Sequence, residues 1–75
     1  MTQDTFVRII HSTIQAKGVN LSGSRASKVN ALARQYSRGE TDIDHAIETL
    51  KSIFADDFTI GHHEYEAIEK KLRRS

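Results

Sequence analysis

The sequence predicts an all-α protein, a compact bundle of about four short helices that spans residues 1–75 as a single domain. Three observations support this fold class. The chain contains no proline, no segment alternates strictly between β-branched and polar residues, and apolar residues recur at three- and four-residue steps in four separate segments. Such steps place the apolar side chains of a segment on one face of a helix. A chain of 75 residues has room for one thin core.

The first helix is predicted over residues 4–17. Asp4 is the expected N-cap, and Gly18 is the expected stop because glycine readily adopts the left-handed backbone that ends a helix. The apolar residues between them follow helical spacing: Phe6, Ile9, Ile10 and Ile14. Residues 19–23 form a connector to the next helix.

The second and third helices are separated by a glycine. Ser24 is expected to cap the second helix, and Gly39 is expected to end it. Thr41 or Asp42 caps the third helix, and Asp44 stands in the spacing of a capping box relative to Thr41. The apolar residues of the second helix are Val29, Leu32, Ala33 and Tyr36, and those of the third are Ile43, Ala46, Ile47, Leu50, Ile53 and Phe54.

The last helix follows a turn at residues 56–58 and begins at Thr59 or Gly61. Its glutamates precede its lysines and arginines, an order that opposes the helix dipole at both ends. Its apolar residues are Tyr65, Ile68 and Leu72. The four helices together predict a core of Ile10, Ile14, Val29, Leu32, Tyr36, Ile43, Ile47, Leu50, Phe54, Ile68 and Leu72.

Several apolar residues lie outside this predicted core. A thin core is not expected to cover all of them in a monomer, so the sequence is also compatible with a homo-oligomer. These residues are Phe6, Val7, Val19, Leu21, Phe58 and Ile60.

The composition narrows the class of protein. The chain has no cysteine, which excludes disulfides and cysteine-ligated zinc. The first residues after Met1 are polar and no long apolar run occurs, so neither a signal peptide nor a membrane span is predicted. We therefore expect a soluble, cytoplasmic protein with no membrane contact and no cofactor.

The four histidines do not form a recognisable metal site. His62 and His63 are adjacent, whereas two ligands on one helix normally stand four residues apart. His62 and Glu66 have that separation, but a structural zinc ion would also require His11 or His45 from another helix. The expectation is therefore that no metal is bound.

No catalytic motif is visible either. The chain has no glycine-rich phosphate loop and no nucleophile elbow around a serine. A domain of this size also leaves little room for a supported pocket. We expect no catalytic residues and no enzymatic activity.

Charge is distributed unevenly although the net charge is only +1. Residues 22–39 contain no acid, whereas residues 40–58 contain Lys51 as their only lysine or arginine among six acids. The interpretation that requires no partner is that these helices attract each other or carry solvated faces. The alternative is two binding surfaces, an acidic face at Asp44 and Glu48 and a basic set that would contact phosphate or a partner. The basic set comprises Arg25, Lys28, Arg34, Arg38, Lys70, Lys71, Arg73 and Arg74.

One segment resembles a known family. Residues 32–50, LARQYSRGETDIDHAIETL, contain the end of a helix, a Gly-Glu turn and an acid-capped amphipathic helix. In this they are similar to the second half of the VbhA-like antitoxins, which inhibit Fic-domain adenylyltransferase toxins. The similar segment covers about a quarter of the chain.

The diagnostic part of that family is an earlier inhibitory helix with the pattern Ser-x-x-x-Glu-Gly or Ser-x-x-x-Glu-Asn. Its glutamate obstructs productive ATP placement on the toxin. This chain has Ser12 in the matching position, but Ala16 stands where the glutamate is expected and Lys17 where glycine or asparagine is expected. The resemblance therefore implies that this chain binds a partner protein but does not act on it through that glutamate.

The sequence predicts a small non-catalytic protein that binds and modulates another protein, in the manner of an antitoxin or a phage-type inhibitor. Oppositely charged faces would orient such a partner. The alternative is a regulator that binds nucleic acid through the basic second helix and the basic C-terminal end. The neighbouring acidic helix and a pI of only about 8.1 weigh against that alternative.

Overall fold

The computed structural model describes residues 1–75 and contains four α-helices with no strand, which confirms the predicted all-α bundle. The helices are α1 (Gln3–Gln15), α2 (Gly23–Ser37), α3 (Ile43–Ile53) and α4 (His62–Arg74). None of them combines the length and the apolar character that crossing a membrane requires.

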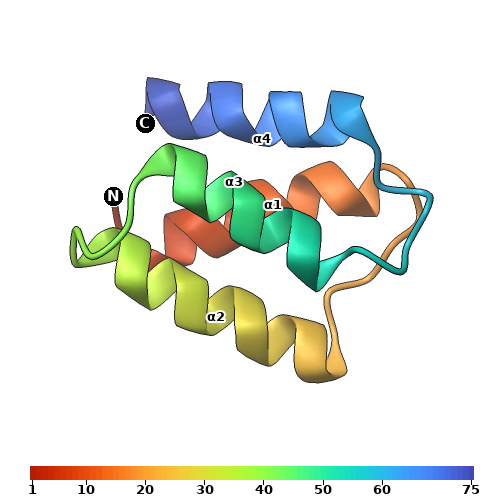
Figure 1. Cartoon of the computed structure of the whole chain (residues 1–75), viewed down its shortest axis with the longest axis horizontal. Helices are drawn as coiled ribbons and strands as arrows, with labels where there is room; N and C mark the ends of the chain where they lie inside the picture. The colour runs from red at the N-terminus through yellow and green to blue at the C-terminus, as the bar shows by residue number, and fades with distance from the viewer.

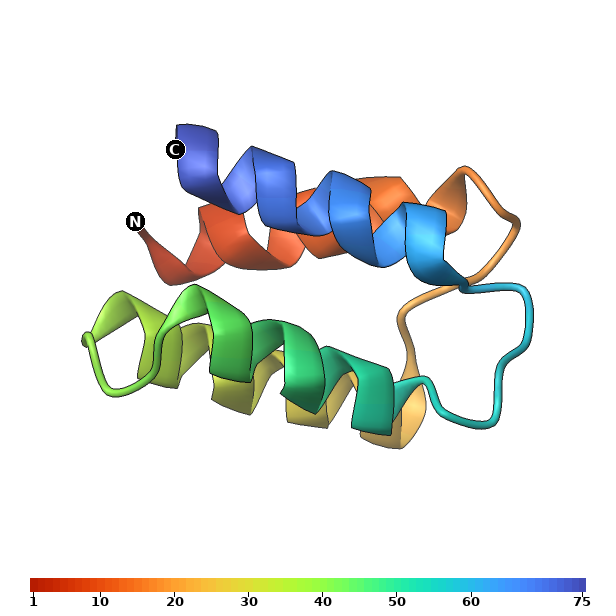
Figure 2. The same ribbon diagram turned by 45° about the horizontal axis from the view of Figure 1, so that its top comes forward.

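The helices run alternately up and down, so that both termini lie at the same end of the bundle (Figure 1). Figure 2 shows α1 and α4 as one layer above α2 and α3. Each helix contacts two neighbours: α1 contacts α2 and α4, and α3 contacts α2 and α4. The diagonal pairs, α1 with α3 and α2 with α4, make no contact. The core is therefore a single apolar centre closed by four neighbouring pairs.

The first two helix starts differ from the predictions. Thr2, and not Asp4, caps α1, because the Thr2 hydroxyl oxygen accepts a hydrogen bond from the Thr5 N–H at 3.2 Å. Asp4 lies in the first turn, where its negative charge opposes the helix dipole. The predicted cap Ser24 is also wrong: it lies inside α2, which follows Ser22.

The other boundaries follow their local signals more closely. α1 ends at Gln15, two residues before the predicted end, and Gly18 and Gly39 adopt φ values of +77° and +76° in the turns after α1 and α2. Such positive φ values carry no steric penalty in glycine. Of the alternatives at the later helices, Asp42 caps α3 by accepting from the His45 N–H at 2.8 Å, and Gly61 precedes α4.

The core contains every predicted residue except Tyr36 and Ile43, which are only partly buried. Both lie at the end of the bundle where α2 turns into α3. Tyr36 packs its ring against Phe6 with 5.1 Å between ring centroids and keeps part of its surface in solvent. Further buried apolar residues fill the core: Phe6, Val19, Ala33, Ala46, Ile53, Ile60 and Tyr65.

The structure covers most of this set and leaves one residue, Phe58, uncovered. Phe6, Val19 and Ile60 are buried, because the connectors fold over the ends of the bundle and α1 turns Phe6 inward. Val7 and Leu21 are partly buried against the core. Phe58 remains, with 96% of its surface exposed.

Replacing Leu50 by alanine tests this packing. Leu50 is fully buried on α3, so Leu50→Ala is expected to lower the free energy of unfolding by about 2–5 kcal/mol. Urea denaturation followed by circular dichroism measures the change. The exposed Ser52→Ala on the same helix is the control and is expected to stay within about 0.5 kcal/mol of wild type. A Leu50→Ala protein as stable as this control would show that α3 does not face the core.

Candidate functional site

The acidic face consists of Asp44 and Glu48 on α3, with 85% and 75% of their side chains exposed. Each carboxylate has one cation nearby. Arg73 on α4 places Nη2 3.7 Å from Asp44 Oδ1, and Lys51 places Nζ 3.9 Å from Glu48 Oε1. Long, exposed pairs of this kind contribute little to stability. The two carboxylates are therefore accessible to a stronger cationic partner.

The basic residues of α2 divide into two groups. Arg25 is only 28% exposed and bonds to the turn after α3, with Nη2 3.0 Å from Asp56 Oδ1 and Nη1 3.3 Å from Asp57 Oδ2. Its guanidinium also lies over the Phe54 ring. The hydrogen bond between Arg25 and Asp56 raises the pKa of the guanidinium and lowers that of the carboxyl group. Arg25 thus links α2 to the turn after α3.

The remaining basic residues of α2, Lys28, Arg34 and Arg38, are exposed and have no carboxylate within 4.0 Å. Arg34 and Arg38 stand four residues apart and share one face of the helix. They form the unpaired part of the predicted basic set on α2.

The basic end of α4 is similarly divided. Lys71 donates a hydrogen bond to the hydroxyl of the buried Thr13 at 3.1 Å, which joins α4 to α1. Arg73 pairs with Glu69 at 3.1 Å and with Asp44. Lys70 and Arg74 are exposed with no carboxylate within 4.0 Å.

The two basic regions do not combine into one surface. α2 and α4 occupy diagonal corners of the bundle and make no contact (Figure 2). A single duplex contacting both regions would have to reach around the acidic α3 or around α1. The predicted basic set is therefore two separate patches.

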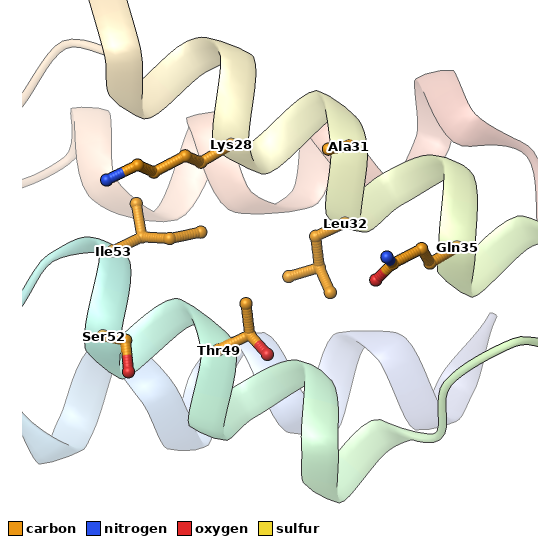
Figure 3. A pocket seen from close by; sticks show the side chains of 7 residues that line it. All are labelled: Lys28, Ala31, Leu32, Gln35, Thr49, Ser52 and Ile53. Carbon is orange, nitrogen blue, oxygen red and sulfur yellow. The ribbon is translucent and has the colours of Figure 1, made fainter.

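The structure adds a groove that sequence reasoning missed. It has a volume of about 360 Å³ and lies between α2 and α3 (Figure 3). Lys28 is its only charged residue, in a chain of which 28% is charged. The available signal was the small Ala31 on α2 together with the short Thr49 and Ser52 on α3. We call this the α2–α3 groove; its lining residues are Lys28, Ala31, Leu32, Gln35, Thr49, Ser52 and Ile53.

A polar hollow of about 700 Å³ continues the groove toward the turn between α2 and α3. It includes Asp42, whose Oδ1 accepts from the His45 N–H and lies 3.0 Å from His45 Nδ1. The hydrogen bond from the backbone N–H of His45 is the main reason that the pKa of Asp42 is lowered. The remaining lining residues are Gln35, Gly39, Glu40, Thr41 and Thr49.

The histidines lie apart from one another except for His62 and His63, whose ring centroids are 6.1 Å apart. His62 Nε2 contacts Glu66 Oε1 at 3.0 Å on the surface of α4. No three histidine, aspartate or glutamate side chains are grouped so that they would hold a metal ion. Every buried side-chain nitrogen or oxygen has a hydrogen-bond partner.

No protein-family model, curated protein or solved structure matches this chain. The similarity of residues 32–50 to the antitoxins therefore remains a hypothesis. In the structure this segment comprises the C-terminal part of α2, the turn and most of α3. Ser12 donates a hydrogen bond to the Ile9 carbonyl, and Ala16 is the exposed C-cap residue of α1.

The lowered pKa of Asp42 predicts a pH dependence. In the folded protein the ionised carboxylate caps α3, so its stabilising contribution is present above the unfolded-state pKa and is lost as the pH falls through the lower, folded-state pKa. Asp42→Asn keeps a capping side chain but cannot titrate.

Thermal melts from neutral pH to about pH 2 are expected to show a steeper loss of stability below about pH 4 for wild type than for Asp42→Asn. Asp42→Ala, which removes the cap, is expected to melt lower than both at neutral pH. Parallel curves for wild type and Asp42→Asn would refute this role of the Asp42 charge.

Proposed function

We propose that this is a non-catalytic protein that binds and modulates another protein through its acidic face. The observation that carries the proposal is the pair Asp44 and Glu48, two strongly exposed carboxylates one helical turn apart on a helix anchored in the core. Their intramolecular pairs are long and exposed, so exchanging them for cations of a partner costs little. Charge complementarity of this kind steers and orients protein partners.

The resemblance to antitoxins supports a modulating role, because the acidic face lies within residues 32–50. With Ala16 in place of the inhibitory glutamate, an antitoxin or phage-type inhibitor of this kind would act by occupying a surface of its target. The absence of cysteine is typical of the cytoplasmic location that this function requires.

The arrangement of the side chains supports a protein without catalysis. Lys28 is the only titratable group among the residues that line the α2–α3 groove. General acid–base and nucleophilic catalysis both depend on at least two positioned groups within hydrogen-bond reach. The least exposed ion pair, Arg25 with Asp57, joins α2 to the turn after α3 and lies outside this groove.

Nucleic-acid binding is the second candidate, and the unpaired Arg34 and Arg38 on α2 favour it. If this pair tracks phosphates, affinity for duplex DNA falls with salt with a log–log slope of about −0.9 per phosphate neutralised. Arg34→Gln with Arg38→Gln would flatten that slope. Because the α2 and α4 patches are separate, nucleic-acid binding is the weaker of the two candidate functions.

Reversing the acidic face tests the leading proposal. Asp44→Lys with Glu48→Lys is expected to reduce capture of the partner from nuclease-treated extracts of the native cells by roughly tenfold, or about 1.4 kcal/mol. Quantitative mass spectrometry of proteins retained by the immobilised variants measures capture, and circular dichroism checks folding.

The control has the same change in net charge elsewhere: Asp4→Lys with Glu66→Lys, on α1 and α4. It is expected to retain the same partner at the wild-type level. Equal capture by both double variants, together with tight and salt-sensitive DNA binding by wild type, would favour the nucleic-acid function instead.

A further inference from the structure

Phe58 is held in solvent by a well-anchored turn. The residues on both sides, Phe54 and Ile60, are buried in the core. Within the turn the Asp57 N–H donates to the Phe54 carbonyl at 3.0 Å, and Asp57 Oδ1 accepts from the Thr59 N–H at 3.0 Å. We call residues 56–60 the Phe58 turn. Its anchoring means that presenting the ring to a partner requires little further ordering, which favours binding.

Arg25 of α2 adds to this anchoring. It bonds to both Asp56 and Asp57, the two residues immediately before Phe58. Single exposed apolar side chains are common on protein surfaces. Phe58 differs because the turn is attached to α2 through Arg25 and to the core through Phe54 and Ile60, and its ring is still 96% exposed.

The α2–α3 groove has the size and chemistry to accept an aromatic ring. Its volume is about 360 Å³, and it is open to solvent on one side. Leu32 and Ile53 lie between the helices, and Ala31 leaves space above them (Figure 3). A buried phenylalanine ring covers about 150–250 Å².

Charges on the turn and at the groove are complementary. Lys28 lines the groove and has no carboxylate within 4.0 Å. Asp56, two residues before Phe58, keeps 82% of its side chain exposed while it bonds to Arg25. A ring entering the groove from this turn would bring the exposed Asp56 toward Lys28, whereas Asp57 stays largely buried against Arg25.

The groove runs along the middle of α2 and α3, and one of its ends faces the end of the bundle that carries the Phe58 turn. Lys28 and Ile53 come from the start of α2 and the end of α3, and the connector that carries Phe58 leaves α3 at that end (Figure 1). The exposed ring does not occupy the groove of its own chain. Two copies related by a twofold axis at this end would each offer a ring and a groove to the other, which gives a closed dimer.

We propose that the α2–α3 groove receives Phe58 from a second copy of this chain, so that two copies form a reciprocal dimer. The surface is distinct from the acidic face, because neither Asp44 nor Glu48 lines the groove. Two rings and two grooves bury less than the 1,200 Å² or so of a standard interface, so the dimer is a weak one that forms at high concentration.

Sedimentation equilibrium between about 10 μM and 1 mM tests the dimer. Wild type is expected to shift from monomer to dimer over this range. Phe58→Ala removes the ring and Ala31→Trp fills the groove, so each is expected to stay monomeric. Asn30→Trp places the same ring one residue away, at an exposed position outside the groove, and is expected to dimerise like wild type.

Mixing the two monomeric variants identifies the contact. Phe58→Ala retains an open groove and Ala31→Trp retains the ring, so the mixture can form one of the two contacts and is expected to associate more weakly than wild type but more strongly than either variant alone. Circular dichroism and unchanged melting temperatures establish that both variants are folded. A monomeric wild type at all concentrations, or a Phe58→Ala or Ala31→Trp protein that still dimerises like wild type, would each overturn the proposal.

Discussion

The structure depends on one apolar core to which each helix contributes a single face. Isolated helices of 11 to 15 residues, the lengths found here, are marginal in water. They are stabilised here because Phe6, Ile10, Val29, Leu50 and Ile68 meet in a common centre. Each helix contacts only its two neighbours, so removing any one helix exposes the core from one side.

The parts of the fold that follow from local chemistry could be predicted from the sequence. Gly39 ends α2 through a left-handed backbone, and Asp42 caps α3 through its own side chain. The start of α1 could not be resolved, because Thr2 and Asp4 are both good capping residues and only backbone geometry distinguishes them. Tyr36 has helical spacing typical of a core residue, but its burial depends on how far it lies from the end of the bundle.

The sequence indicates which charged residues the candidate site contains, but it does not indicate how they are placed in space. The opposite charges of the second and third helices are evident in the sequence, whereas the pairing of Arg25 with Asp56 joins residues far apart in the chain. Diagonal packing separates the basic ends of α2 and α4, a consequence of topology that no local pattern encodes. As a result α3 offers two different sides, with Asp44 toward Arg73 of α4 and with Thr49 and Ser52 toward α2.

The dependence of all four helices on one core is tested most directly by comparing two probes of a single thermal unfolding transition. Far-ultraviolet circular dichroism follows the helices, and near-ultraviolet circular dichroism follows Tyr36 on α2 and Tyr65 on α4, at opposite corners of the bundle. The two signals are expected to change together in one sigmoidal transition, as in cooperative two-state unfolding. Loss of the tyrosine signal at a lower temperature than loss of helicity would contradict a single shared core.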